Sequence, residues 1–107
     1  MLRFILPLTL IAGTAAGQGQ PMSAQPMAGE GLRLSRQWCA ACHAVSREMP
    51  PPTGDAAPSF PAIASMPSTT ETGLRVFLQT PHANMPDFQI SRAELDAVVT
   101  YLLSLRP

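Results

Sequence analysis

Apolar residues recur at helical spacing in the last part of the chain, where they predict the clearest element of secondary structure. The stripe consists of Leu95, Val98, Val99, Leu102 and Leu103. Ser91 and Glu94 stand three residues apart directly before it, which is the spacing of a capping box. The pattern therefore predicts a helix that begins after Ser91 and runs to about Leu105.

Two earlier stretches also predict helices. Residues 30–41 carry apolar side chains at helical intervals, at Leu32, Leu34, Trp38 and Ala41. A shorter helix is predicted over residues 71–79, with Thr70 as its cap and Leu74, Phe77 and Leu78 on one side.

The segment between these two helices, residues 44–70, is rich in proline. Its prolines are Pro50, Pro51, Pro52, Pro58, Pro61 and Pro67. Proline lacks an amide donor and disfavours helix at the residue before it, so the segment predicts mostly loop. So long a loop in a small domain is expected where it wraps around something. No stretch alternates as a strand does, and the predicted fold class is therefore all-α.

The N-terminus has the pattern of a secretory signal peptide. Arg3 precedes an apolar stretch of 13 residues, 4–16, and small residues follow it. An uncleaved anchor is the alternative, but a spanning helix needs about 20 apolar residues. We therefore predict a cleaved signal over residues 1–17, a flexible leader over 18–29 and a folded domain over 30–107. Cleavage after Ala16 or Gly17 would leave an exported, periplasmic protein with no membrane span.

Composition narrows the possible functions. The 107 residues have a formal net charge of zero and include no lysine, so no basic stripe is available for nucleic acid. Two cysteines cannot provide a disulfide framework for a folded part of fewer than 80 residues. A domain of that size usually needs a metal or another cofactor in order to fold.

The string Cys39-Ala40-Ala41-Cys42-His43 is the most informative in the chain, because C-x-x-C-H is typical of covalent haem attachment. The two thiols can form thioethers with a porphyrin, and His43 can then supply the proximal imidazole to the iron. A thioredoxin-like pair would need a βαβ context and cysteines at a helix start. A zinc site would need a second pair of ligands, for which only His82 is a further strong candidate, and a disulfide across two residues would constrain little.

Four residues are candidates for the sixth iron ligand: Met49, Met66, His82 and Met85. Met49 follows His43 too closely to leave slack for a path around the haem edge. Met66 fits better as a methionine that fills a gap in the core. Met85 lies before Pro86 in a predicted rigid turn between two helices, which favours it as the soft distal ligand. His82 is the alternative and would give a lower potential.

Taken together, these motifs resemble those of a short bacterial monohaem class I cytochrome c. The resemblance covers about residues 29–105 and rests on the C-x-x-C-H string, on Asn84-Met85-Pro86 and on the closing helix. It implies a small fold in which the N- and C-terminal helices pack around one covalently bound haem c. In that family a proline carbonyl faces the proximal imidazole, which indicates Pro58 here. Ala57 stands where the family often has glycine, and prolines 50–52 also depart from its pattern.

The predicted function is one-electron transfer rather than enzymatic catalysis, with redox proteins as donor and acceptor. The iron would be low-spin, with His43 and Met85 as axial ligands. The candidates for an apolar shell around it are Phe60, Ile63, Phe77, Phe88, Leu95, Val98 and Val99. Two alternatives keep the haem: a subunit docked to a periplasmic dehydrogenase, and a sensor or catalytic protein with an open sixth position.

Overall fold

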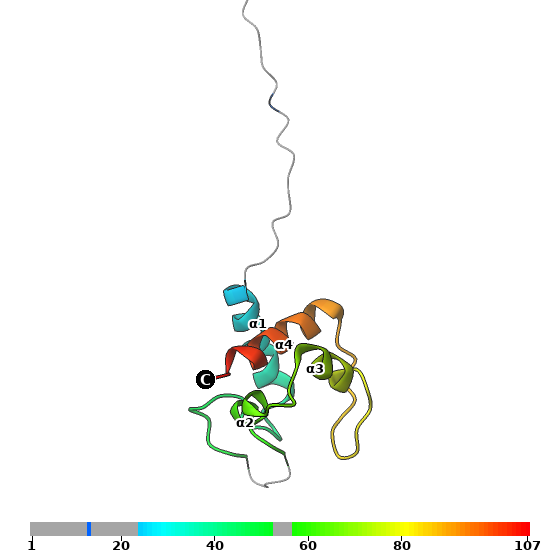
Figure 1. Cartoon of the computed structure of the whole chain (residues 1–107). Helices are drawn as coiled ribbons and strands as arrows, with labels where there is room; N and C mark the ends of the chain where they lie inside the picture. Colours follow the sequence, from blue (N-terminus) through cyan, green and yellow to red (C-terminus); the bar gives the residue numbers. More distant parts are fainter. Residues whose placement is uncertain (1–12, 14–23, 53–56) are drawn as a thin grey trace, which may run out of the picture.

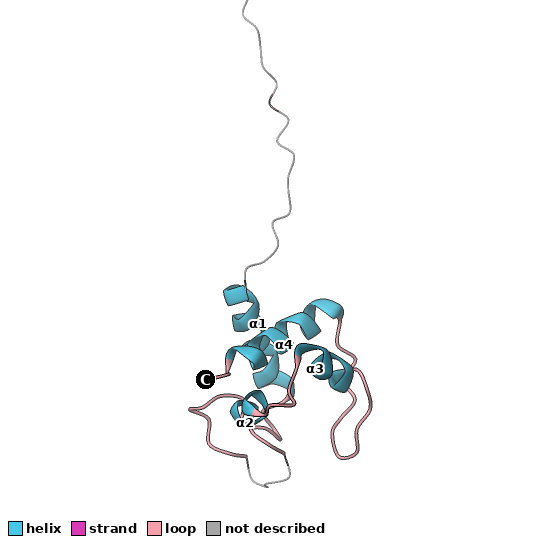
Figure 2. Ribbon diagram, in the orientation of Figure 1, coloured by secondary structure: helices cyan, strands magenta, loops and turns pink. Residues whose placement is uncertain are grey.

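The computed structural model describes residue 13 and residues 24–52 and 57–107. Apart from Gly13, the predicted signal peptide lies outside the described residues, as do residues 18–23 of the predicted leader. The described residues form four helices, α1 (Ala24–Trp38), α2 (Phe60–Ser65), α3 (Glu71–Leu78) and α4 (Arg92–Ser104), joined by loops (Figures 1 and 2). They contain no strand, so the all-α prediction is confirmed for this part of the chain.

The N- and C-terminal helices pack directly on each other, and α1·α4 is the most extensive helix contact (Figure 1). Gly31 of α1 lies at their closest approach. A Cβ atom built there would lie 2.0 Å from the carbonyl oxygen of Ala97 and 2.6 Å from Cβ of Tyr101. Only glycine therefore allows the two backbones to approach so closely.

The core lies along α4. One cluster joins α4 to α1 through Leu34, Ala97 and Val98. The other joins α4 to the two short helices and the first loop, through Val45, Phe60, Ala64, Leu74, Leu95, Val99, Tyr101 and Leu102. The predicted stripe of α4 is thus buried except for Leu103, which is half-buried, and Ala97 and Tyr101 are buried in addition.

The helix caps agree with the sequence. The Ser91 hydroxyl accepts the amide of Glu94 at 3.2 Å, and the Ser91 amide donates to the Glu94 carboxylate at 2.7 Å. The Thr70 hydroxyl accepts the amide of Gly73 at 3.0 Å and starts α3. Each cap satisfies amides at the helix start that have no partner within the helix.

Helix α1 begins earlier than predicted, at Ala24 rather than near residue 30, and it ends at Trp38. Residues 24–29, assigned from the sequence to the flexible leader, are therefore helical. Met27 explains the extension, because it packs against the cluster of α1 and α4, and its sulfur accepts a hydrogen bond from the Thr100 hydroxyl at 3.2 Å. This support comes from a distant part of the chain, so local periodicity does not reveal it.

Helix α2 lies inside the segment predicted to be loop, and that prediction was wrong for residues 60–65. The Ser59 hydroxyl caps the helix by accepting the amide of Ala62 at 3.2 Å. Pro61 lies in the first turn, where the missing amide donor costs nothing. Ala64 and Phe60 then bury the inner side of the helix in the core.

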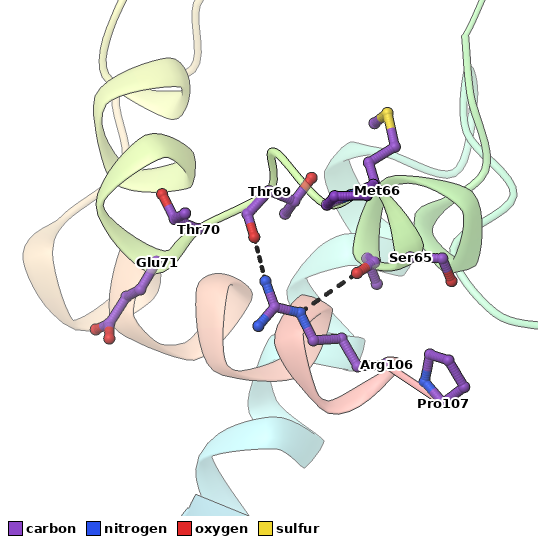
Figure 3. Close-up of a pocket in the computed structure, with 9 residues that line it drawn as sticks. Ser65, Met66, Thr69, Thr70, Glu71, Arg106 and Pro107 are labelled. Carbon is purple, nitrogen blue, oxygen red and sulfur yellow. Dashed lines mark hydrogen bonds between the residues drawn. The ribbon is translucent and has the colours of Figure 1, made fainter.

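Hydrogen bonds at the C-terminal end of α4 connect it to the first loop, to α2 and to the segment before α3. Arg47 donates to the carbonyl of Leu105 at 2.5 Å, and Arg106 donates to the carbonyls of Thr69 and Ala64 (Figure 3). No described helix has both the length and the apolar character that crossing a membrane requires.

Candidate functional site

The chain makes one more turn beyond the end of α1, and this turn carries the C-x-x-C-H string. The amide of Cys39 donates to the carbonyl of Ser35 at 2.8 Å, and the carbonyl of Cys39 accepts from Cys42 at 3.1 Å and from His43 at 2.8 Å. Both cysteines are free thiols; Cys39 is half-buried and Cys42 exposed. The helical turn thus holds two thiols and one imidazole together.

The imidazole of His43 is half-buried and oriented by the loop that returns towards it. Its Nδ1 atom lies 2.6 Å from the carbonyl oxygen of Pro58, so a proton on Nδ1 is donated to that oxygen. The amide of Phe60 donates to the carbonyl of Ala44 at 2.8 Å and holds the two segments side by side. With Nδ1 used in this way, Nε2 is the ring nitrogen left to bind a metal.

The chemistry of the thiols differs from that of a thioredoxin-like pair. Burial, with a smaller contribution from neighbouring Cys42, raises the pKa of Cys39 to about 11. Reactive thiol pairs have a lowered pKa and use a helix N-terminus to obtain it. Here the pair follows the C-terminal end of α1, and the structure gives no support to a thiol–disulfide reaction.

The candidate distal ligands Met85 and His82 belong to one tight turn between α3 and α4. The Met85 amide approaches the His82 carbonyl at 3.4 Å, and Asn84 has a φ of 64°, a left-handed conformation that asparagine tolerates. Met85 is half-buried. His82 is exposed; its Nδ1 lies 2.7 Å from the Thr80 carbonyl and its ring stacks on Phe77 at 3.7 Å between centroids.

An aromatic contact connects this loop to the attachment turn. The rings of Trp38, directly before Cys39, and Phe88, three residues after Met85, stack with centroids 6.2 Å apart. The loop that carries Met85 is therefore held against the end of α1.

The other two methionines considered as distal ligands, Met49 and Met66, have different surroundings. Met49 packs against the main core cluster. Met66 caps the C-terminal end of α2 and is 43% exposed, and Figure 3 shows its side chain pointing away from Arg106. The Met49 amide also approaches a carbonyl three residues back, that of Ser46 at 3.3 Å, but among the described residues only the Met85 turn contains a non-glycine residue with a positive φ, Asn84.

The residues present fit a covalently bound haem. Two thiols, an oriented imidazole and a thioether are the donor set of haem c with histidine and methionine ligands. In the expected shell, Phe60, Leu95, Val98 and Val99 are buried, and Ile63 is half-buried. Phe77 and Phe88 instead remain 44% and 36% exposed near the Met85 turn, an apolar surface available to a large apolar group.

The all-helical fold and this donor set define the class of a small c-type cytochrome. Residues 26–102 match a protein family described as cytochrome c oxidase, cbb3-type, subunit III. The chain is 35% identical over 100 residues to cytochrome c-552 of Bradyrhizobium diazoefficiens, and the alignment covers 94% of this chain and 93% of that relative. No solved structure matches the chain.

The chain belongs to this cytochrome c family, whose members carry haem c covalently, and it is accordingly a haem-c electron carrier. The resemblance deduced from the sequence is thereby confirmed. Two structurally important residues were not singled out from the sequence: Gly31, at the helix crossing, and Tyr101, whose hydroxyl reaches the His43 segment. Only the packing of α4 reveals them.

Proposed function

We propose that this protein is a periplasmic one-electron carrier, with haem c attached through Cys39 and Cys42 and ligated by His43 and Met85. The observation that carries the proposal is the hydrogen bond of 2.6 Å between Nδ1 of His43 and the Pro58 carbonyl. It presents Nε2 of an imidazole that follows two free thiols on one turn.

Each residue has a defined role in this proposal. The haem iron, when bound, supplies the one-electron couple. Pro58 fixes the tautomer and orientation of His43, which would make the imidazole a stronger electron donor to the bound iron. Met85 supplies a soft thioether, which favours the reduced state, and the turn around Asn84 holds it in place. The core along α4 excludes water, so that electron transfer needs little rearrangement.

The periplasmic location depends on the signal peptide predicted over residues 1–17. Export would bring the thiols to the compartment where c-type haem is attached. The intact mass of the mature protein tests this directly. We expect a haem-containing chain that starts at Gly17 or Gln18; a retained Met1 would contradict cleavage.

Two matched variants test the distal ligand. Met85→Ala should lower the reduction potential and let carbon monoxide bind to the reduced protein, because it removes the proposed sixth ligand. His82→Ala should change neither property, since His82 is exposed and held by Thr80 and Phe77. The reverse pattern would assign the ligand to His82. Carbon monoxide binding by the unmodified reduced protein would indicate an open iron.

A second candidate function is that of a cytochrome subunit held in a larger oxidoreductase. The family description names an oxidase subunit, and the zero net charge of the chain offers little electrostatic steering to a mobile carrier. Copurification with a larger enzyme at moderate salt would show that the protein is a subunit, and a free cytochrome under the same conditions would show that it is a separate carrier.

A further inference from the structure

Tyr101 ties the segment that carries His43 to helix α4. The Tyr101 side chain is buried, and its hydroxyl donates a hydrogen bond of 2.5 Å to the carbonyl oxygen of Val45, two residues after His43. Val45 is 1% exposed, so water cannot easily replace this donor. The position of the His43 segment therefore depends on a hydroxyl from the far end of the sequence.

A second connection runs through the ring of Phe60, which lies close to the rings of both His43 and Tyr101. Its centroid is 5.4 Å from that of His43 and 6.4 Å from that of Tyr101. The backbone of Phe60 also donates to Ala44, the residue between His43 and Val45. Tyr101 therefore acts on both sides of the His43–Pro58 hydrogen bond: on residues 43–45 through its hydroxyl and on residues 58–60 through Phe60.

We propose that Tyr101 is a positioning residue for the His43 imidazole and thereby sets how strongly Nδ1–H is held by the Pro58 carbonyl. The inference rests on the proposed role of His43 as an iron ligand. A ligand imidazole that donates its other N–H becomes more basic and better stabilises the more charged ferric state. Loosening the two segments weakens this donation, which makes the reduced state relatively more stable.

The test compares two haem-loaded variants that each remove one hydroxyl from neighbouring positions of α4. Tyr101→Phe keeps the ring and deletes the donor to Val45. Thr100→Val deletes the hydroxyl that donates to Met27 of α1 and makes no hydrogen bond with the His43 segment in the described part of the chain. Two properties are measured in each: the midpoint reduction potential, and the solvent exchange rate of the His43 Nδ1 proton by NMR. Denaturant unfolding of both variants gives the change in global stability, for which the exchange rates are corrected.

We expect Tyr101→Phe to raise the potential and to speed exchange of the His43 proton roughly fivefold or more, as the loss of one hydrogen bond implies. Thr100→Val should leave both at the wild-type values. The proposal is overturned if Tyr101→Phe leaves either property unchanged or lowers the potential. It is also overturned if Thr100→Val shifts the potential and the exchange rate as much as Tyr101→Phe does, which is the result expected if Tyr101 only stabilised the fold.

A second variant covers the case in which Tyr101→Phe does not yield folded protein. Phe60→Leu keeps an apolar side chain but removes the ring between Tyr101 and His43. It should also speed exchange of the Nδ1 proton, and an unchanged rate would overturn the proposal. Failure of the proposed function is recognised separately: the wild-type protein would then lack haem, or its haem would show no imidazole ligand.

Discussion

Replacing Gly31 by alanine directly perturbs the crossing of α1 and α4. The new Cβ would lie 2.0 Å from the Ala97 oxygen, about 1.4 Å short of the 3.4 Å at which ordinary contact begins. Its neighbours there are backbone atoms and the Cβ of Tyr101, and none of them can rotate away. The helices must therefore move apart.

The expected loss of stability follows from this geometry. Overpacking a core costs about 1–3 kcal/mol, and a clash with rigid backbone belongs at the upper end of that range. Alanine regains about 1 kcal/mol through its better helix propensity. The net loss is then about 2 kcal/mol, which for a domain of this size lowers the melting temperature by roughly 8–16 °C.

Gly29 provides a matched control in the same helix, because a Cβ built there has nothing within 4 Å. Gly29→Ala should therefore raise stability by about 0.5–1 kcal/mol. Thermal unfolding of the two haem-loaded variants, followed by far-ultraviolet circular dichroism, measures both effects. The reasoning is refuted if Gly31→Ala melts at or above the wild-type temperature, or if both substitutions shift it in the same direction.

Three further outcomes are expected. Ser35→Ala should stabilise the protein by about 1 kcal/mol in denaturant unfolding, because the Ser35 side chain is fully buried and its hydroxyl has no partner among the described residues; a loss of stability would reveal a partner in the loaded protein. Asn84→Val should loosen the Met85 turn and weaken the sulfur-to-iron absorption of the oxidised protein, whereas Asn84→Gly should preserve it, because only the β-branched residue is strained at a φ of 64°. Burial raises the pKa of the Tyr101 phenol. The contribution of the protonated phenol to the free energy of unfolding is therefore complete below pH 10 and is lost as the pH rises through the folded-state pKa. In the haem-loaded protein both cysteines are thioethers, and the chain has one tyrosine and no lysine, so this alkaline loss should be absent from Tyr101→Phe; an equal loss in the variant would assign it to another group.

Features with local causes could be predicted from the sequence. The capping box of Ser91 and Glu94 and the Thr70 cap lie within a few residues of the amides that they bind, and both are present. The buried side of α4 likewise follows from the spacing of its apolar residues. The C-x-x-C-H string identified the chemistry because haem attachment itself requires that local spacing.

Features that depend on distant contacts could not be predicted in this way. The start of α1 at Ala24 depends on Met27 meeting Thr100, and the need for glycine at position 31 depends on the backbone of Ala97. Helix α2 was missed for a different reason. The prolines of residues 44–70 predict loop, although Pro61 occupies a first-turn position where proline suits a helix.

The position of Pro58 shows how a family resemblance supplements such reasoning. Nothing in the local sequence distinguishes this proline from the others in residues 44–70. The resemblance indicated it, and the structure contains the contact between its carbonyl and His43 at 2.6 Å.

The absorption spectrum of the exported, purified protein in its oxidised and reduced states tests the central claim most directly. The account predicts sharp low-spin haem bands on reduction and a weak sulfur-to-iron band in the near-red of the oxidised protein, which disappears in Met85→Ala. Haem bands without the near-red feature would contradict ligation by Met85, and a protein without haem would contradict attachment at Cys39 and Cys42.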